Sequence, residues 1–163
     1  MTYKVTYTSL GEKGDCTYRW SLWRSWNSTG DPRVCTFVML NPSTADGHRD
    51  DPTIRRCVGF ARREGFTGIH VVNLFALRAT NPKELKAAHD PVGSGNDCVI
   101  LDAVRSSEFT VAAWGRHGPL SGRDKAVLEL LEGYPIWCLG TTKKGQPRHP
   151  LPVRKSAPME RYR

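Results

Sequence analysis

The sequence predicts an α/β protein, a three-layer α/β/α sandwich with a central four-stranded, mostly parallel sheet and an N-terminal β-hairpin. From Val34 onward, short apolar runs typical of buried strands alternate with segments of helical periodicity. Such alternation implies right-handed crossovers between parallel strands, with helices on both faces of the sheet. The chain of 163 residues is long enough to bury one such core, so we expect a single domain, 1–163.

Residues 1–33 are expected to form a hairpin extension of the sheet. Tyr3–Thr8 and Thr17–Trp23 have strand-like composition and flank the turn sequence Gly-Glu-Lys-Gly. The hairpin either extends one edge of the sheet or packs across its end. A turn-rich stretch, 25–32, then leads into the α/β core.

The core, residues 34–142, is expected to contain strands and helices in alternation. The strands are short apolar runs: Val34–Leu40, Ile69–Leu74, Phe109–Ala113 and Pro135–Leu139. The helices show helical periodicity or a proline suited to the first turn: Pro52–Gly65, Pro82–His89, Asn96–Ser106 and Gly122–Glu132. The remaining residues, 143–163, are basic and proline-rich and are expected to form a loop and tail without a strand.

Composition bounds the partners of the protein. The net charge of +8 favours a polyanion, most simply nucleic acid. No stretch reaches membrane-spanning length and the first 20 residues lack an apolar segment, so we expect a cytoplasmic protein without membrane contact. The five cysteines form no Cys-x-x-Cys pair, and we expect Cys35 and Cys138 to be buried free thiols. No cofactor and no obligate protein partner is expected.

All four predicted core strands end in distinctive polar or aromatic residues. These ends are Asn41-Pro42-Ser43-Thr44, Asn73-Leu74-Phe75, Trp114-Gly115-Arg116-His117-Gly118, and Gly140-Thr141-Thr142 with Pro147-Arg148-His149-Pro150 after it. The carboxyl ends of parallel strands share one edge of a sheet, where ligand crevices form. The sequence therefore predicts a binding site at this edge.

Each of these residues has a structural explanation beside the functional one. Asn41 can cap a turn, and Trp114 can belong to the core. Asn73 lies in an apolar run and needs hydrogen-bond partners, which either the edge of a base or a neighbouring loop would supply. His149, between Arg148 and Pro150 on a loop, does not fit the pattern of a core histidine, and we expect it to be functional.

The acidic residues after the first core strand have two interpretations. Asp46, Asp50 and Asp51 could hold a metal ion, because hard cations take oxygen ligands. Asp50 or Asp51 also suits the N-cap of the helix that begins at Pro52, where a carboxylate meets the helix dipole favourably. We favour the cap and predict no metal site.

Basic residues gather in the helix 52–65 and in the tail. We expect them to contact nucleic-acid phosphates, although a solvated helix face explains those in the helix equally well. They are Arg55, Arg56, Lys143, Lys144, Arg148, Arg154 and Lys155.

Together, the motifs resemble a known family. LNPSTAD, DPTIRRC, VVNLFALRATNP, AAWG and GQPRHPL closely resemble the family called domain of unknown function 1643. This resemblance covers Val34 to about Pro152 and implies no established activity.

The same motifs resemble, more distantly, the uracil-DNA glycosylase superfamily. Its motifs correspond in order to VMLNPS, VVNLF, AAWG and RHPLP. The resemblance implies an α/β/α sandwich with a four-stranded parallel sheet. It also implies an enzyme that flips a base out of DNA and hydrolyses its N-glycosidic bond without a metal.

The resemblance also implies roles for single residues. Asn41 would position the attacking water or the strained sugar, and His149 would stabilise negative charge on the departing base. The remaining predicted contacts to the base are Pro42, Ser43, Asn73 through its edge, and Phe75 or Trp114 by stacking.

Departures from the superfamily pattern bear on the substrate. Asn41 stands where the most active enzymes have Asp, Ser43 where Gly or Tyr is common, and Leu151 where the last motif has Ser. These changes favour a damaged or modified base over uracil. Leu151 or Val153 is the candidate wedge that fills the emptied base stack.

Two other functions remain open at this point. One is a non-catalytic module of the same fold that binds nucleic acid, a nucleotide or a modified base. The other is a metal-dependent phosphoester enzyme built on Asp46, Asp50 and Asp51.

Overall fold

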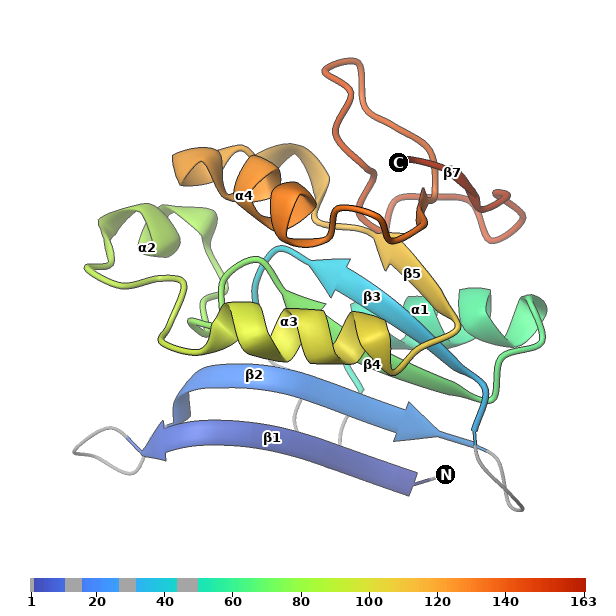
Figure 1. Cartoon of the computed structure of the whole chain (residues 1–163), viewed down its shortest axis with the longest axis horizontal. Coiled ribbons are helices and arrows are strands. Elements are labelled where there is room, and N and C mark those ends of the chain that lie inside the picture. Colours follow the sequence, from blue (N-terminus) through green and yellow to red (C-terminus); the bar gives the residue numbers. More distant parts are fainter. Residues whose placement is uncertain (1, 11–15, 27–31, 44–49) are drawn as a thin grey trace.

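The computed structural model describes residues 2–10, 16–26, 32–43 and 50–163 (Figure 1). Its strands pair into one mixed sheet in the order β1-β2-β4-β3-β5-β6-β7. The strands are β1 (Thr2–Leu10), β2 (Cys16–Ser25), β3 (Val34–Met39), β4 (Gly68–Asn73), β5 (Phe109–Ala112), β6 (Ile136–Cys138) and β7 (Glu160–Arg161). The helices are α1 (Pro52–Arg63), α2 (Pro82–Ala87), α3 (Asn96–Arg105) and α4 (Arg123–Leu130), with short 3-10 turns at Gly115–His117 and Leu120–Gly122.

The predicted α/β class is confirmed, but the sheet is mixed. Strands β4, β3, β5 and β6 pair in parallel, while β2 pairs antiparallel with β4 and β7 antiparallel with β6. The hairpin β1–β2 thus extends one edge of the sheet, the first of its two expected placements. The expectation of a tail without a strand was wrong, because Glu160 and Arg161 pair with Cys138 and Trp137.

The apolar side chains form two clusters on the two faces of the sheet. Every residue of β3 is buried, and neighbours along the strand face opposite sides. Phe37 and Met39 pack with Ile54, Cys57, Phe60 and Ala61 of α1, whereas Val38 packs with residues of α3 and α4. In Figure 1, α1 accordingly lies behind the sheet and α3 in front of it. Cys35 and Cys138 are buried free thiols, as predicted.

The N-terminus of α1 confirms the capping interpretation of the acidic segment. The Ile54 amide donates a hydrogen bond to Oδ1 of Asp51 at 2.8 Å, and Pro52 stands in the first turn. Asp50 instead accepts a bond from Nε of the fully buried Arg24 at 2.7 Å. Asp46 lies outside the described residues, and the described part of the chain contains no group of His, Cys, Asp or Glu that could hold a metal ion. Nor does it contain a helix long and apolar enough to cross a membrane.

Substituting Asp50→Ala is expected to lower the free energy of unfolding by about 3 kcal/mol, because it removes a carboxylate that pairs with a buried guanidinium. Arg24 is fully buried in this ion pair, whereas the side chains of Arg33 and Glu108 are 56% and 51% exposed in theirs. Glu108→Ala is therefore the matched control, with an expected loss of about 0–1 kcal/mol. Urea denaturation of both variants measures the difference, and equal losses would contradict the assignment of Arg24–Asp50 as a structural ion pair.

Candidate functional site

A cavity of about 720 Å³ opens where the parallel strands end. Its wall comes from the segments that follow all four strands β3, β4, β5 and β6, together with the first turn of α1. This is the edge at which the sequence predicted a site. The lining residues are Met39, Leu40, Asn41, Ser43, Thr53, Ala79, Thr80, Pro82, Trp114, Gly115, Arg116, His117, Thr142, Arg148, His149, Leu151, Pro152 and Val153.

The order of the strands explains which predicted residues meet. Strand β3 pairs with β5 in register Val38↔Ala112, so the segments that begin at Asn41 and Trp114 leave the sheet side by side. The loop after β6 is fastened to them by the amide of Gly115, which donates to the carbonyl of Pro147 at 2.9 Å. Asn41, Ser43, Trp114, Arg148 and His149 therefore line one cavity.

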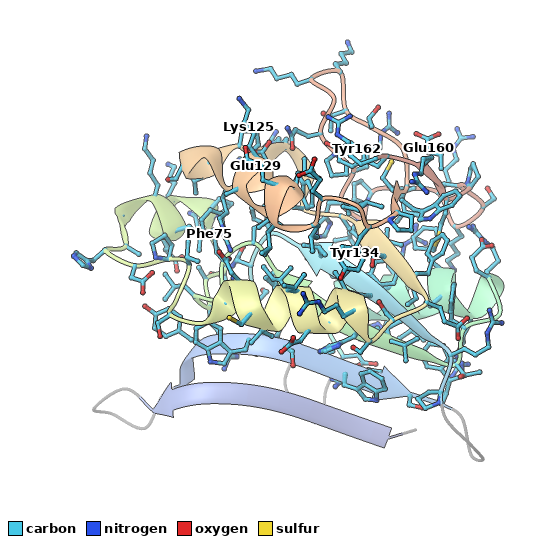
Figure 2. All side chains as sticks on the ribbon, viewed as in Figure 1. Phe75, Lys125, Glu129, Tyr134, Glu160 and Tyr162 are labelled. Carbon is cyan, nitrogen blue, oxygen red and sulfur yellow. The ribbon has the colours of Figure 1, made fainter. Side chains whose placement is uncertain are left out.

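Asn73, Phe75 and Pro42 do not line this cavity, although contacts to the substrate were predicted for them. Asn73 is 1% exposed and Phe75 is fully buried in the apolar cluster on the α3 face (Figure 2). The carbonyl oxygens of Asn73 and Leu74 accept bonds from Nδ2 of Asn96 on α3 at 3.0 and 3.1 Å, so α3 covers the end of β4. Nδ2 of Asn73 has no hydrogen-bond partner among the described residues, and the predicted substrate contacts of these three residues have no support from this cavity.

The predicted phosphate-binding residues divide into three groups. Arg148 lines the cavity, and Lys143 and Lys144 line a neighbouring cavity of about 370 Å³ that shares Arg116 and Thr142 with it. Arg55 and Arg56 donate to backbone carbonyls of this chain, and Arg55 is exposed, so their contacts to a phosphate backbone stay a prediction. Arg154 and Lys155 are exposed outside the main cavity.

The Asn41 side chain is fixed by two backbone carbonyls. Its Nδ2 donates to Pro42 O at 2.9 Å and to Ala79 O at 2.7 Å. Carbonyl oxygens only accept hydrogen bonds, so this pair of contacts assigns the amide nitrogen and places Oδ1 on the other branch of the amide. Among the described residues no donor bonds to that Oδ1. Asn41 therefore offers a fixed acceptor at the cavity.

His149 offers a donor. The Leu151 amide donates to its Nδ1 at 3.3 Å, which favours the neutral tautomer with the proton on Nε2. Burial lowers the pKa of His149 below its ordinary value, and the carboxylate of Asp51 partly opposes this shift. The imidazole is thus neutral near neutral pH and keeps an N–H for a ligand.

Trp114 forms part of the wall and is only 2% exposed. Its Nε1 donates to Gln146 Oε1 at 2.8 Å, and Gln146 Nε2 donates in turn to Oδ2 of the buried Asp124 at 2.8 Å. Sequence reasoning missed the roles of Asp124 and of Gln146, although Gln146 lies in the GQPRHPL motif, because only the fold brings their side chains to the indole. These hydrogen bonds fix the indole on its buried side. Because so little of the ring is exposed, Trp114 contributes an edge to the cavity wall and does not offer an open surface for stacking.

The cavity is electropositive. Its described lining includes the guanidinium groups of Arg116 and Arg148 and contains no Asp or Glu. Positive side chains on a concave surface attract anionic ligands and focus their field there. The arrangement suits a phosphate-bearing ligand, or a reaction in which negative charge develops.

Gly118→Ala is expected to destabilise the fold by about 1–3 kcal/mol and to deform the cavity, because overpacking displaces well-packed neighbours. A Cβ built on Gly118 would overlap the indole of Trp114 and lie 3.0 Å from Gln146 Oε1. Gly59→Ala is the matched control, since nothing lies within 4 Å of its added methyl. In helix α1 that change should stabilise by about 0.5–1 kcal/mol. Urea denaturation tests both, and a neutral Gly118→Ala would show that Trp114 is not tightly held.

Comparison with known proteins gives one family. The family model described as "Protein of unknown function (DUF1643)" matches residues 19–151. This match includes every residue named above as lining the cavity except Pro152 and Val153. No curated protein and no solved structure matches the chain.

Proposed function

The chain belongs to the DUF1643 family, whose description names no activity, and we propose that its cavity is the active site of a DNA glycosylase-like enzyme. The enzyme would flip a damaged or modified base out of DNA and hydrolyse its N-glycosidic bond. One observation carries the proposal: Asn41, whose Nδ2 is fixed by two carbonyls, and His149, whose Nδ1 accepts from the Leu151 amide, line the same electropositive cavity, which leaves Asn41 Oδ1 as an acceptor and His149 Nε2 as a neutral donor. As a further part of the proposal, the parallel strands β4-β3-β5-β6 with their helices correspond to the sandwich of the uracil-DNA glycosylase superfamily.

The two groups match the charges of the reaction. As the C1′–N bond breaks, its electron pair passes to the base and the sugar becomes oxocarbenium-like. Asn41 Oδ1 accepts a hydrogen bond from a water whose oxygen then bonds to C1′. That water releases one proton to the solvent, and the departed base anion takes up one proton from the solvent, so the products are the free base and an abasic sugar. His149 Nε2–H donates to the negative charge on the departing base, a kind of stabilisation that contributes strongly to catalysis.

The substrate is expected to be a base that leaves readily. No carboxylate from the described residues lines the cavity, so none of them can act as a strong general base toward the water. Most of the barrier must then be lowered through the departing base. The expected substrate is therefore a modified base whose anion is stabilised.

Leu151 is the better candidate for the wedge that enters the emptied stack. Its side chain is 48% exposed at the mouth of the cavity, whereas Val153 is 6% exposed and packs in the core. Apolar side chains that enter a base stack must project from the surface in this way. Arg148, Arg116, Lys143 and Lys144 would contact the flanking phosphates.

A non-catalytic module that binds nucleic acid or a modified base is the second candidate. The same lack of a carboxylate in the described lining favours it, because binding needs no general base. The metal-dependent phosphoester enzyme is not proposed, because Asp50 is engaged with Arg24 and Asp51 caps α1.

The test is a screen of oligonucleotides that carry different modified bases, performed with a metal chelator present. Strand scission by alkali after incubation reports abasic sites. We expect abasic sites from at least one modified base and none from unmodified DNA. Binding without abasic sites from any oligonucleotide would favour the module instead.

A further inference from the structure

Two arginines of α1 hold the loop that carries His149. The guanidinium carbons of Arg56 and Arg63 lie 5.1 and 5.3 Å from the centroid of the Phe60 ring. From there, Arg56 Nε donates to Pro150 O at 3.4 Å and its Nη2 donates to Val153 O. Arg63 Nη1 donates to Lys155 O at 2.7 Å. The segment 150–155 is thus fastened to α1 through its backbone carbonyls.

One of these bonds acts on the peptide group next to the histidine. The carbonyl of Pro150 and the amide of Leu151 belong to the same planar trans peptide, so they point in opposite directions. Two donors hold the carbonyl side of this group: Arg56 Nε at 3.4 Å and the amide of Val153 at 3.3 Å. The N–H side donates to His149 Nδ1 at 3.3 Å. If the peptide group rotated, the donor would leave Nδ1.

We propose that Arg56 is a positioning residue, which keeps His149 in the Nε2–H tautomer through the Pro150–Leu151 peptide group. The catalytic consequence of this role depends on the function proposed above, but the effect on the tautomer does not. Arg56 was expected to contact a nucleic-acid phosphate. Its half-buried guanidinium is instead engaged with Pro150 and Val153 of its own chain.

A purely structural role for Arg56 makes a different prediction. If the guanidinium only packs on Phe60, its removal changes the free energy of unfolding and leaves the tautomer of His149 as it was. If it orients the peptide group, its removal changes the tautomer even in a protein that stays folded.

The experiment compares imidazole ¹⁵N chemical shifts of His149 in the ligand-free protein, at a pH where the ring is neutral. Arg56→Met keeps an unbranched apolar stem over Phe60 and removes the donors to the loop. Arg62→Met is the matched control, because Arg62 lies on the same helix over the Trp26 ring, at 4.9 Å from its centroid. No described contact joins Arg62 to residues 150–155.

The wild type and Arg62→Met are expected to show the Nε2–H tautomer, and Arg56→Met a mixture of both tautomers. An unchanged pure tautomer in folded Arg56→Met would overturn the inference. Should Arg56→Met fail to fold, Arg56→Lys keeps the cation over Phe60 but lacks the forked donors. His149 in Arg56→Lys should still show a second tautomer. A single Nε2–H tautomer in this variant would overturn the inference as well.

Activity separates this inference from the proposed function. On a substrate found by the screen, Arg56→Met is expected to lower the single-turnover rate by about 10- to 100-fold with affinity retained, because a misaligned group loses catalysis before binding. If no base is released by any form of the protein while the tautomer still changes, the proposed function fails and the positioning role stands. If the wild type releases a base and the tautomer of His149 never changes, the positioning role of Arg56 fails and the proposed function stands.

Discussion

Replacing His149 with phenylalanine is expected to slow base release by about 10²–10³-fold, the usual loss when a donor to developing charge is removed. The ring volume is kept, so the cavity should remain filled and oligonucleotide affinity should change by no more than a few-fold. The Leu151 amide loses its acceptor, but it lies at an exposed residue where water can replace it. Single-turnover formation of abasic sites measures the rate. His89→Phe, at an exposed histidine outside the cavity, should leave the rate unchanged.

The pKa of His149 also predicts how the rate of base release and the stability of the protein depend on pH. Burial lowers the pKa of folded His149 below the ordinary value of 6.5, so the neutral donor persists somewhat below that pH. The rate should therefore stay level as pH falls through 6.5 and change only when the ring takes up a proton. The unfolded chain binds this proton first, so the stability that His149 contributes is present above 6.5 and is lost as pH falls toward the folded pKa. A rate that changes with a midpoint above 6.5 would contradict a neutral His149.

Asn41→Asp is expected to give a slower and less stable enzyme, although it introduces a general base. Asn41 Nδ2 donates to two carbonyls at 2.9 and 2.7 Å, and a carboxylate oxygen in its place would face both acceptors. Two lost bonds and a buried repulsion should lower the free energy of unfolding by about 2–4 kcal/mol. The pKa of the new carboxyl should lie above its usual range, because only the protonated form can donate.

Asn41→Ala separates the catalytic role of Asn41 from the repulsion that a carboxylate would introduce. It removes the acceptor for the water without setting oxygen against oxygen, so it should slow base release by about 100-fold and destabilise less than Asn41→Asp. Urea denaturation and single-turnover rates of the two variants provide the comparison. An Asn41→Asp protein that is as stable as the wild type and faster would show that the Nδ2 contacts do not control this site.

The edge of the sheet at which the cavity opens could be predicted from the sequence because its position depends only on local patterns. Apolar runs identify the four parallel strands, and the residues after each run reach the cavity whatever the order of the strands. A capping role for Asp50 or Asp51 followed in the same way from their place before Pro52, and the structure shows that Asp51 is the cap.

Contacts between distant segments could not be predicted. Asn73 was assigned to the base because a strand-end amide needs partners. Helix α3 covers this end, and its Asn96 binds the backbone carbonyls of Asn73 and Leu74, while Nδ2 of the Asn73 side chain is buried without a hydrogen-bond partner among the described residues. Arg56 has the same sequence signal as an exposed basic residue, and only the fold shows that its partners lie more than 90 positions away. Strand β7 was missed because two residues, Glu160 and Arg161, carry no periodicity.

Mass spectrometry of the reaction products tests the central claim most directly. The wild type and the Asn41→Ala/His149→Phe double variant would each be incubated with the modified oligonucleotides under chelator. We predict that the wild type yields one free modified base and an unbroken strand that has lost that base and gained one water. The double variant should yield neither. A strand cut with its base still attached, or unchanged oligonucleotides that nevertheless bind the wild type, would contradict N-glycosidic hydrolysis in this cavity.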